Sequence, residues 1–212
     1  MNKIKNIGTC FLCKENVEHL AITKHTKKCV GKHSMADVYA ENNKEKIFLV
    51  KIFFGKYFWL YVEINGSSTL ETLDDFLRKT WLECCYHMSQ FKINDVLYSS
   101  DEKMGKAIHR TLPVGSKFNY EYDFGSTTKL EGKVISTRYG ELTTEIRLIA
   151  RNNLPEVQCT QCKRAPEVIC TACYDLFCKK CEKSHKSCGG EEYMLPVVNS
   201  PRMGVCGYTG NE

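Results

Sequence analysis

The residues with the clearest capacity for chemistry are cysteines, of which this chain of 212 residues has thirteen. They gather in three places: three lie in residues 10–29, two are adjacent at 84–85, and eight lie in residues 159–206. Cysteine at this density indicates either a disulfide framework or bound metal. We find no apolar run of signal-peptide length at the start, and Cys-x2-Cys recurs along the chain. We therefore expect metal ligation and a cytoplasmic location.

Residues 151–195 hold the densest ligand pattern, with eight ligands in four pairs that can close two tetrahedral zinc sites. Only four residues separate the second pair from the third, which is too tight for these two pairs to serve one metal ion. We therefore predict that the pairs interleave. The predicted ligand sets are Cys159, Cys162, Cys178 and Cys181 for one ion, and Cys170, Cys173, His185 and Cys188 for the other.

This spacing resembles the B-box zinc domain of tripartite-motif proteins, in which cross-braced sites hold a compact protein-interaction module. The resemblance implies a protein partner. A segment of this length buries too little apolar surface to fold alone, so metal would supply its stability. A redox dithiol is the alternative interpretation of any single Cys-x2-Cys, but three such pairs and a His-x2-Cys in one run favour metal.

A second ligand pattern lies in residues 8–33, with the spacing Cys-x2-Cys-x11-His-x3-Cys. Residues four apart share one face of a helix, so His25 and Cys29 can point at one metal ion. The pattern resembles a two-Cys, two-His zinc finger with cysteine in the last ligand position. His19 and His33 are competing ligands, and a loop with unrelated cysteines is the alternative interpretation. The predicted zinc ligands are Cys10, Cys13, His25 and Cys29.

Charge is distributed unevenly along the chain. Residues 1–40 carry seven lysines and three acidic residues, a net charge of +4, whereas residues 41–150 are neutral and residues 151–212 carry +1. Zinc-bound cysteines are thiolates, so three zinc ions would leave the first segment positive and make the last one negative. Lys24, Lys27 and Lys28 lie at helical spacing and predict a stripe that contacts phosphates of a nucleic acid or a ribonucleoprotein. A merely solvated charged face is the alternative.

Residues 41–150 show no metal pattern and predict a folded α+β domain. Two β-rich runs separated at Gly55-Lys56 predict a hairpin, and later alternating segments predict a mostly antiparallel sheet. Ser68 and Glu71 match a capping box that opens an amphipathic helix of roughly four turns. Residues 90–99 predict one further strand, and residues 104–110 predict a short helical turn. The stripe of this main helix consists of Leu70, Leu73, Leu77, Trp81 and Cys84.

The segments YEYDFGS, LPVGSKF and FLRKTWLECCYHMSQF resemble the plasmid pRiA4b ORF-3-like family over roughly residues 45–150. The family pattern continues with Asp and Trp after YDFG, whereas this chain has Ser126, Thr127 and Thr128 there. The resemblance implies an α+β fold found near plasmids and mobile elements. It implies no settled activity.

Two functional classes compete for this chain. All three predicted sites can be filled by four protein ligands, which is typical of structural rather than catalytic zinc. The alternative is a mobile-element-associated enzyme with its active site near Cys84, His87 and Asp123. However, Cys84 continues the apolar stripe and is expected in the core, and Asp123 is expected to hydrogen-bond a turn. Cys206 has no partner at ligand spacing.

The sequence therefore predicts a non-catalytic adaptor with three zinc ions, with its finger directed to nucleic acid and its C-terminal module to protein. No run of apolar residues is long enough to span a membrane. The predicted parts are a zinc finger (1–40), an α+β domain (41–150), a double zinc module (151–195) and a docked tail (196–212).

Overall fold

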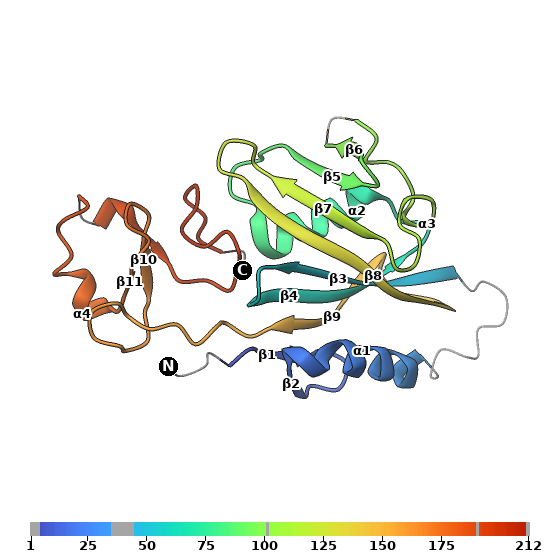
Figure 1. Ribbon diagram of the computed structural model, residues 1–212, viewed down its shortest axis with the longest axis horizontal. Coiled ribbons are helices and arrows are strands. Elements are labelled where there is room, and N and C mark those ends of the chain that lie inside the picture. The colour runs from blue at the N-terminus through green and yellow to red at the C-terminus, as the bar shows by residue number, and fades with distance from the viewer. Residues whose placement is uncertain (1–4, 35–44, 101, 190, 211–212) are drawn as a thin grey trace. The chain divides into compact units, whose positions relative to one another are not determined.

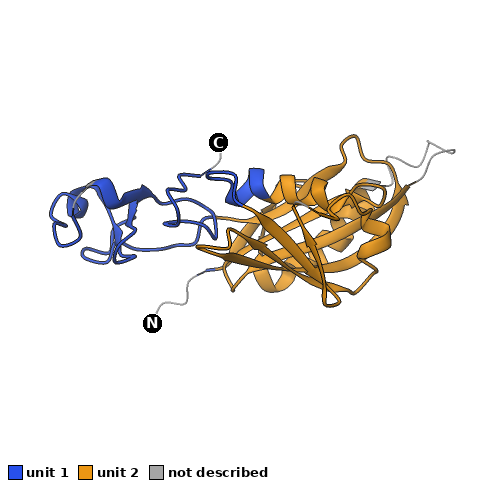
Figure 2. Ribbon diagram, turned by 90° about the horizontal axis from the view of Figure 1, so that it is seen from above, with its two compact units in different colours: residues 1–5, 78–87, 154–212 blue, residues 6–77, 88–153 orange. Residues whose placement is uncertain are grey.

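The computed structural model describes residues 5–34, 45–100, 102–189 and 191–210. The chain forms two compact units, shown in Figure 2. Unit 1 comprises residues 1–5, 78–87 and 154–212, and unit 2 comprises residues 6–77 and 88–153. Among the described residues, no helix has the length and apolar character needed to cross a lipid bilayer.

Unit 2 is built on a nine-stranded antiparallel sheet with the strand order β2-β1-β9-β4-β3-β8-β7-β5-β6. Its strands are β1 (Ile7–Cys10), β2 (Asn16–Glu18), β3 (Glu45–Phe54), β4 (Phe58–Asn65), β5 (Ser89–Ile93), β6 (Val96–Ser99), β7 (Lys117–Tyr122), β8 (Thr128–Gly140) and β9 (Ile146–Asn152). Its helices are α1 (His19–Ser34), α2 (Leu70–Leu77) and α3 (Ile108–Thr111). The predicted α+β class with a mostly antiparallel sheet is confirmed.

Both faces of the inner strand β4 are covered, because six consecutive side chains, Trp59–Ile64, are buried. Figure 1 shows α1 lying along one face of the sheet and α2 on the other. The face toward α1 is apolar, and its cluster joins α1 residues Ile22 and Val30 to Trp59 and Tyr61 of β4. The N-terminal finger is therefore packed on the sheet of unit 2 and extends it through the pairing of β1 with β9.

Glycine at position 8 allows this close packing. A Cβ atom there would lie 2.2 Å from the indole of Trp59 and 2.3 Å from the carbonyl oxygen of Arg151. The indole Nε1 of Trp59 also donates a 2.8 Å hydrogen bond to Asn6. The predicted boundary between residues 40 and 41 lies outside the described residues, whereas residues 6–34 belong to the same unit as the sheet.

A buried carboxylate holds α2 to strands β5 and β7 of the sheet. Asp74 accepts hydrogen bonds from Ser89 Oγ of β5 at 2.7 Å and from Tyr120 OH of β7 at 2.6 Å. A second buried carboxylate, Glu63, is paired with Arg138 and Arg147 at 2.6 Å each. Each buried charge is thus satisfied by hydrogen bonds, as burial requires.

The main helix begins and ends differently from the prediction. Its first turn is capped by Thr69 Oγ1, which accepts a 3.2 Å hydrogen bond from the Thr72 N–H, so the Ser68–Glu71 capping box is wrong by one residue. After α2 the chain continues as a π-helix, η2 (Arg78–Leu82), in which the Glu83 N–H reaches back to the Arg78 carbonyl. The wider π turn ends the helix at Leu82, before Cys84.

The single strand predicted over residues 90–99 is instead the hairpin β5–β6. Asn94 and Asp95 have φ values of 47° and 64° at its turn. Two left-handed residues in a two-residue loop match a type I′ turn, whose twist suits a tight hairpin. The predicted hairpin at Gly55-Lys56 is confirmed as β3–β4.

Unit 1 contains little regular structure beside η2. Its elements are β10 (Val168–Cys170), β11 (Leu176–Phe177), α4 (Lys179–Glu182), the 3-10 helix η3 (Glu191–Tyr193) and β12 (Met194–Pro196). Strands β11, β10 and β12 form a three-stranded sheet. Cysteines make up much of the buried cluster, in which Phe177 is the one fully buried aromatic residue. The apolar core of the module is therefore small.

Candidate metal centres

Cysteine and histidine side chains meet in four groups of four within the described part of the chain, and in each group the ligand atoms lie within 4.8 Å of one another. None of the thirteen cysteines forms a disulfide. The groups are Cys10, Cys13, His25 and Cys29; Cys159, Cys162, Cys178 and Cys181; Cys170, Cys173, His185 and Cys188; and Cys84, Cys85, His87 and Cys206. The first three are the sets expected from spacing, and the structure has the interleaved arrangement in the C-terminal module.

The separations within these groups match a tetrahedral metal site. With Zn–S bonds of about 2.3 Å, two sulfur ligands of one zinc ion lie about 3.8 Å apart, and a sulfur and a nitrogen ligand about 3.5 Å apart. The Sγ atoms of Cys10 and Cys29 are 3.7 Å apart, and those of Cys162 and Cys178 are 3.5 Å apart. Disulfide sulfurs lie only about 2.05 Å apart, so these are spaced as ligands rather than as a bridge.

One backbone turn recurs at three of the ligand pairs. The N–H of the first cysteine bonds to the carbonyl five residues later, and the N–H of the residue after the second cysteine bonds to the carbonyl of the first. The residue after the second cysteine has a positive φ each time: 66° at Lys14, 62° at Lys163 and 60° at Tyr174. Positive φ is uncommon outside glycine, so its repetition marks one shared turn. The pairs are Cys10 and Cys13, Cys159 and Cys162, and Cys170 and Cys173.

The finger site takes its first ligand from β1, its second from the turn, and its last two from adjacent turns of α1. His25 Nε2 lies 3.3 Å from Cys13 Sγ, while His25 Nδ1 faces Glu15 at 3.8 Å. A carboxylate on the far ring nitrogen is the usual outer partner of a metal-bound histidine, because it orients the ring. Burial and the neighbouring thiols Cys10 and Cys13 raise the pKa of Cys29 to about 12, so a cation is needed to hold all three as thiolates.

The two competing histidines differ in how near they lie to the finger ligands. The ring of His19 lies 5.8 Å from the ring of Trp59, between centroids, and burial together with Lys51 lowers the pKa of His19. His33 Nδ1 lies 2.9 Å from the carbonyl oxygen of Cys29 and 3.6 Å from the Sγ of the same residue, so this ring borders the finger site. Neither histidine belongs to the four-ligand group of the finger.

The four-cysteine group of the module is flanked by an arginine. Arg164 Nε donates to Cys162 Sγ at 3.2 Å, and this bond lowers the pKa of Cys162 to about 6. A zinc ion with four thiolates carries a net charge of −2, so nearby cations stabilise it. Lys179, Lys180 and Lys183 line a surface cavity of about 510 Å³ with Arg164. They supply positive charge beside this site.

The second site of the module is stabilised by backbone and ring contacts. Burial raises the pKa of Cys170, but N–H groups of Cys173 and Ala172 outweigh that effect, so the pKa falls to about 6. His185 Nε2 lies 3.7 Å from Cys173 Sγ, and its ring packs on Phe177 with centroids 4.3 Å apart. The main aromatic core residue thus holds a ligand ring in place.

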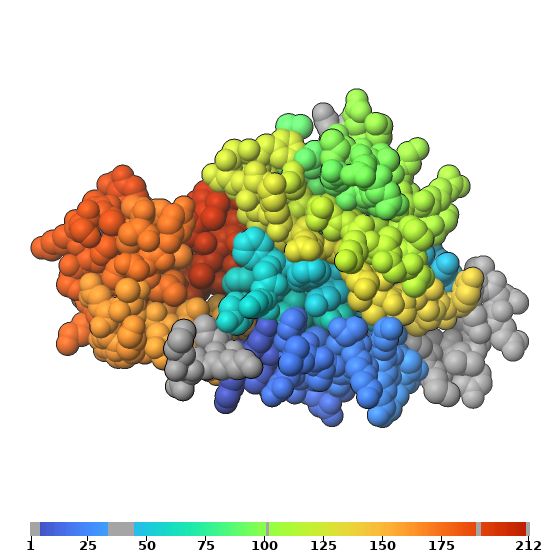
Figure 3. Space-filling model, in the orientation of Figure 1, coloured from blue at the N-terminus to red at the C-terminus, as the bar shows by residue number. Residues whose placement is uncertain are grey.

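The three lysines of the predicted phosphate stripe, Lys24, Lys27 and Lys28, are all exposed on α1. Their neighbours Thr26 and Cys29 are buried. The stripe therefore lies on the outer side of the finger helix. In Figure 3 the segment that includes α1, drawn in blue, lies at the surface of the molecule.

Cys84, His87 and Asp123, the residues of the alternative active site, do not form one catalytic group. Asp123 is buried with φ 64° and accepts hydrogen bonds from the N–H groups of Gly125 and Ser126 at 3.0 and 3.2 Å, so the expected turn is confirmed. Cys84 follows the end of the helix and is only partly buried, so its expected place in the helix core is wrong. Cys84 and His87 are instead grouped with Cys85 and Cys206.

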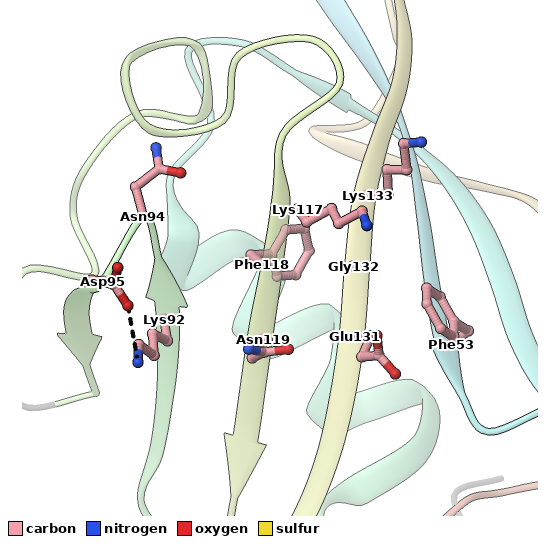
Figure 4. Close-up of a pocket in the computed structure, with 10 residues that line it drawn as sticks. All are labelled: Phe53, Lys92, Asn94, Asp95, Lys117, Phe118, Asn119, Glu131, Gly132 and Lys133. Carbon is pink, nitrogen blue, oxygen red and sulfur yellow. Dashed lines mark ion pairs between the residues drawn. The ribbon is translucent and has the colours of Figure 1, made fainter.

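A pocket of about 360 Å³ lies on unit 2, and Figure 4 shows its lining. Lys92, Lys117 and Lys133 contribute to it, and Lys92 forms a 3.1 Å ion pair with Asp95. The ten lining residues include no cysteine or histidine. The pocket therefore offers no thiol or imidazole for binding a metal ion or for nucleophilic catalysis.

The group of Cys84, Cys85, His87 and Cys206 was not expected from the sequence. Cys85 and Cys206 lie 121 positions apart, so spacing within a short motif does not show this group. The sequence offered only one indication of this group. Cys84, Cys85 and Cys206 belong to none of the three predicted sites, and His87 follows Cys85 by two residues.

No family model matches this sequence, and no curated protein matches it. Two solved chains match by structure. One is a protein of unknown function from Methanosarcina mazei Go1, with 16% identity, a TM-score of 0.43, and coverage of 51% of this chain and 68% of that chain.

Proposed function

We propose that this protein is a non-catalytic zinc-binding adaptor whose finger contacts nucleic acid and whose C-terminal module contacts protein. The supporting observation is the closure of the expected ligand groups by four protein side chains each. A catalytic zinc ion keeps a position open for water or substrate, whereas four cysteine-rich ligands are typical of a structural site. The zinc ions would then shape surfaces rather than carry out chemistry.

The nucleic-acid contact is proposed for the outer side of α1. Lys24, Lys27 and Lys28 are exposed at positions i, i+3 and i+4 of α1, and the finger keeps a positive charge after metal binding. Side chains of this kind contact phosphates without reading bases, so we expect salt-dependent binding with little sequence preference.

We also propose that residues 45–150 belong to the pRiA4b ORF-3-like family, with an association with mobile elements. The turn at Asp123 supports this assignment, because it gives the YDFG segment a defined backbone role. It does not supply an activity.

The deciding experiment measures the salt dependence of nucleic-acid affinity for two triple variants of the full chain. Changing Lys24, Lys27 and Lys28 to Gln should flatten the slope of log affinity against log salt by about two to three units. The matched control changes Lys179, Lys180 and Lys183 to Gln in the module and should leave the slope unchanged.

Zinc content should remain the same in both variants, because none of the six lysines is a ligand. Equal binding by the parent and the finger variant at every salt concentration would rule out the finger as the contact surface. A loss confined to the module variant would transfer the contact to the C-terminal module.

A further inference from the structure

The fourth group of cysteines and histidine lies within unit 1, where it brings residues 84–87 together with the C-terminal tail. Cys85 Sγ lies 3.6 Å from Cys84 Sγ and 3.7 Å from Cys206 Sγ. His87 Nε2 lies 3.0 Å from Cys85 Sγ and 3.2 Å from Cys206 Sγ. Three sulfurs and one nitrogen thus converge on one point.

These separations are those of a metal site. The sulfur–sulfur distances match the edge of about 3.8 Å expected for two thiolates on one zinc ion. The nitrogen–sulfur distances fall a few tenths of an ångström below the edge of about 3.5 Å, a difference that a small side-chain rotation removes. Three thiolates and one imidazole form a ligand set that suits zinc.

The loop that carries three of these ligands is held by an ionic network. Arg78 donates to Glu83 at 2.9 Å and to the His87 carbonyl oxygen at 2.7 Å. The other carboxylate oxygen of Glu83 accepts the Tyr86 N–H at 2.5 Å, and Tyr86 has φ 59°. A left-handed residue between Cys85 and His87 turns the chain so that both side chains face the same point. Support of this kind is typical of the outer shell of a metal site.

The tail that carries Cys206 is fixed by independent contacts. Ser200 Oγ donates a 2.6 Å hydrogen bond to the carbonyl oxygen of Trp81 and accepts one from the Arg202 N–H at 2.9 Å. Arg202 and Tyr208 are 0% and 2% exposed. The position of Cys206 beside the loop therefore does not depend on its own contacts alone.

We propose that Cys84, Cys85, His87 and Cys206 form a fourth zinc site, which joins the 84–87 loop to the C-terminal tail and exchanges its metal more readily than the other three. Binding of Zn²⁺ releases the protons of the three thiols to solvent and forms three Zn–S bonds and one Zn–N bond. The order of exchange follows from burial. Each of the other groups contains a buried cysteine, whereas all four ligands here are exposed or only partly buried.

The test counts zinc ions by native mass spectrometry on the full chain, purified with zinc under reducing conditions. The parent should carry four ions, and Cys206→Ser and His87→Gln should each carry three. Cys206→His supplies a new nitrogen ligand and should retain four. The matched control is Tyr86→Asn, which lies between two ligands, tolerates the left-handed backbone and should also retain four.

A chromogenic chelator adds the second readout. The parent should release one ion in a fast phase, and this phase should be absent from Cys206→Ser and present in Tyr86→Asn. A parent with three ions and with Cys84, Cys85 and Cys206 open to alkylation would overturn the proposal. Four ions in both Cys206→Ser and His87→Gln would also overturn it. So would a parent chain whose mass is lower by two hydrogens, because that loss shows a disulfide among these cysteines.

Discussion

The finger and the C-terminal module use the same backbone turn to present cysteines, but they differ in what surrounds it. In unit 2, the finger helix packs Ile22 and Val30 against Trp59 and Tyr61 of a large sheet. In unit 1, the cluster around the ligands consists mainly of the cysteines themselves, with Phe177 at its centre. An apolar core supports the first site, whereas the second depends on its metal ions for most of its stability.

Removal of metal should therefore affect the two regions to very different extents. With a strong chelator under reducing conditions, we expect residues 159–188 to lose amide protection almost completely, while strands β3, β4 and β8 retain it. Hydrogen exchange read by mass spectrometry on the full chain measures both regions at once. Equal loss of protection in the module and in the sheet would remove the distinction.

The support of the finger by the sheet should be visible in a single substitution. Trp59→Ala removes a fully buried indole that contacts Gly8 and His19, and should cost about 3–5 kcal/mol of unfolding free energy. It should also weaken zinc binding by the finger while leaving the module fully loaded. The control is Tyr57→Ala on an exposed ring two residues earlier, for which we expect little change. Denaturant unfolding and zinc titration supply the two measurements.

The interleaved ligand sets predict which substitutions in the module interact. Cys173→Ser and Cys188→Ser damage the same site, so their combined effect should fall short of the sum by roughly 0.5–3 kcal/mol. Cys162→Ser acts on the other site and should couple to them less. A double-mutant cycle on thermal unfolding separates these cases, and strong coupling of Cys162 to Cys173 with none between Cys173 and Cys188 would contradict the arrangement.

The smallest expected effect concerns pH. The pKa of His19 is lowered in the folded protein, first by burial and then by Lys51, so the unfolded chain binds its proton more readily. Stability from this group is complete above the unfolded pKa near 6.5 and falls as the pH drops below it. With zinc in excess, His19→Gln should make the unfolding free energy less dependent on pH between about 5 and 7. If the unfolding free energy of His19→Gln depends on pH as strongly as that of the parent, the acid sensitivity comes from the metal ligands instead.

Three of the four ligand groups could be predicted from the sequence because their members lie close together in the chain. Cys-x2-Cys turns and a helical His-x3-Cys fix geometry locally, so spacing is informative. The group that contains Cys206 depends on tertiary packing that brings His87 next to a residue 119 positions away. No local rule predicts such an approach.

The same distinction holds for the fold. Alternation of polar and apolar residues predicted the antiparallel strands and the hairpin between β3 and β4. It did not predict that β9 lies between β1 and β4, because that order depends on long-range pairing. The turn at Asn94-Asp95 was missed because the apolar residues on both sides of it read as one strand.

The pairing of β1 with β9 has a consequence for the solubility of the protein. Exposed strand edges carry free N–H and C=O groups that can pair with another chain. Here the edge beside β9 is closed by β1 and by the three-residue strand β2. The end of β1 and the turn that follows it carry two ligands of the finger site, Cys10 and Cys13. Loss of that metal ion would weaken the pairing of β1 and β2 at this edge while leaving β9 intact. Metal starvation should thus convert a capped sheet into a template for aggregation well before the sheet itself unfolds.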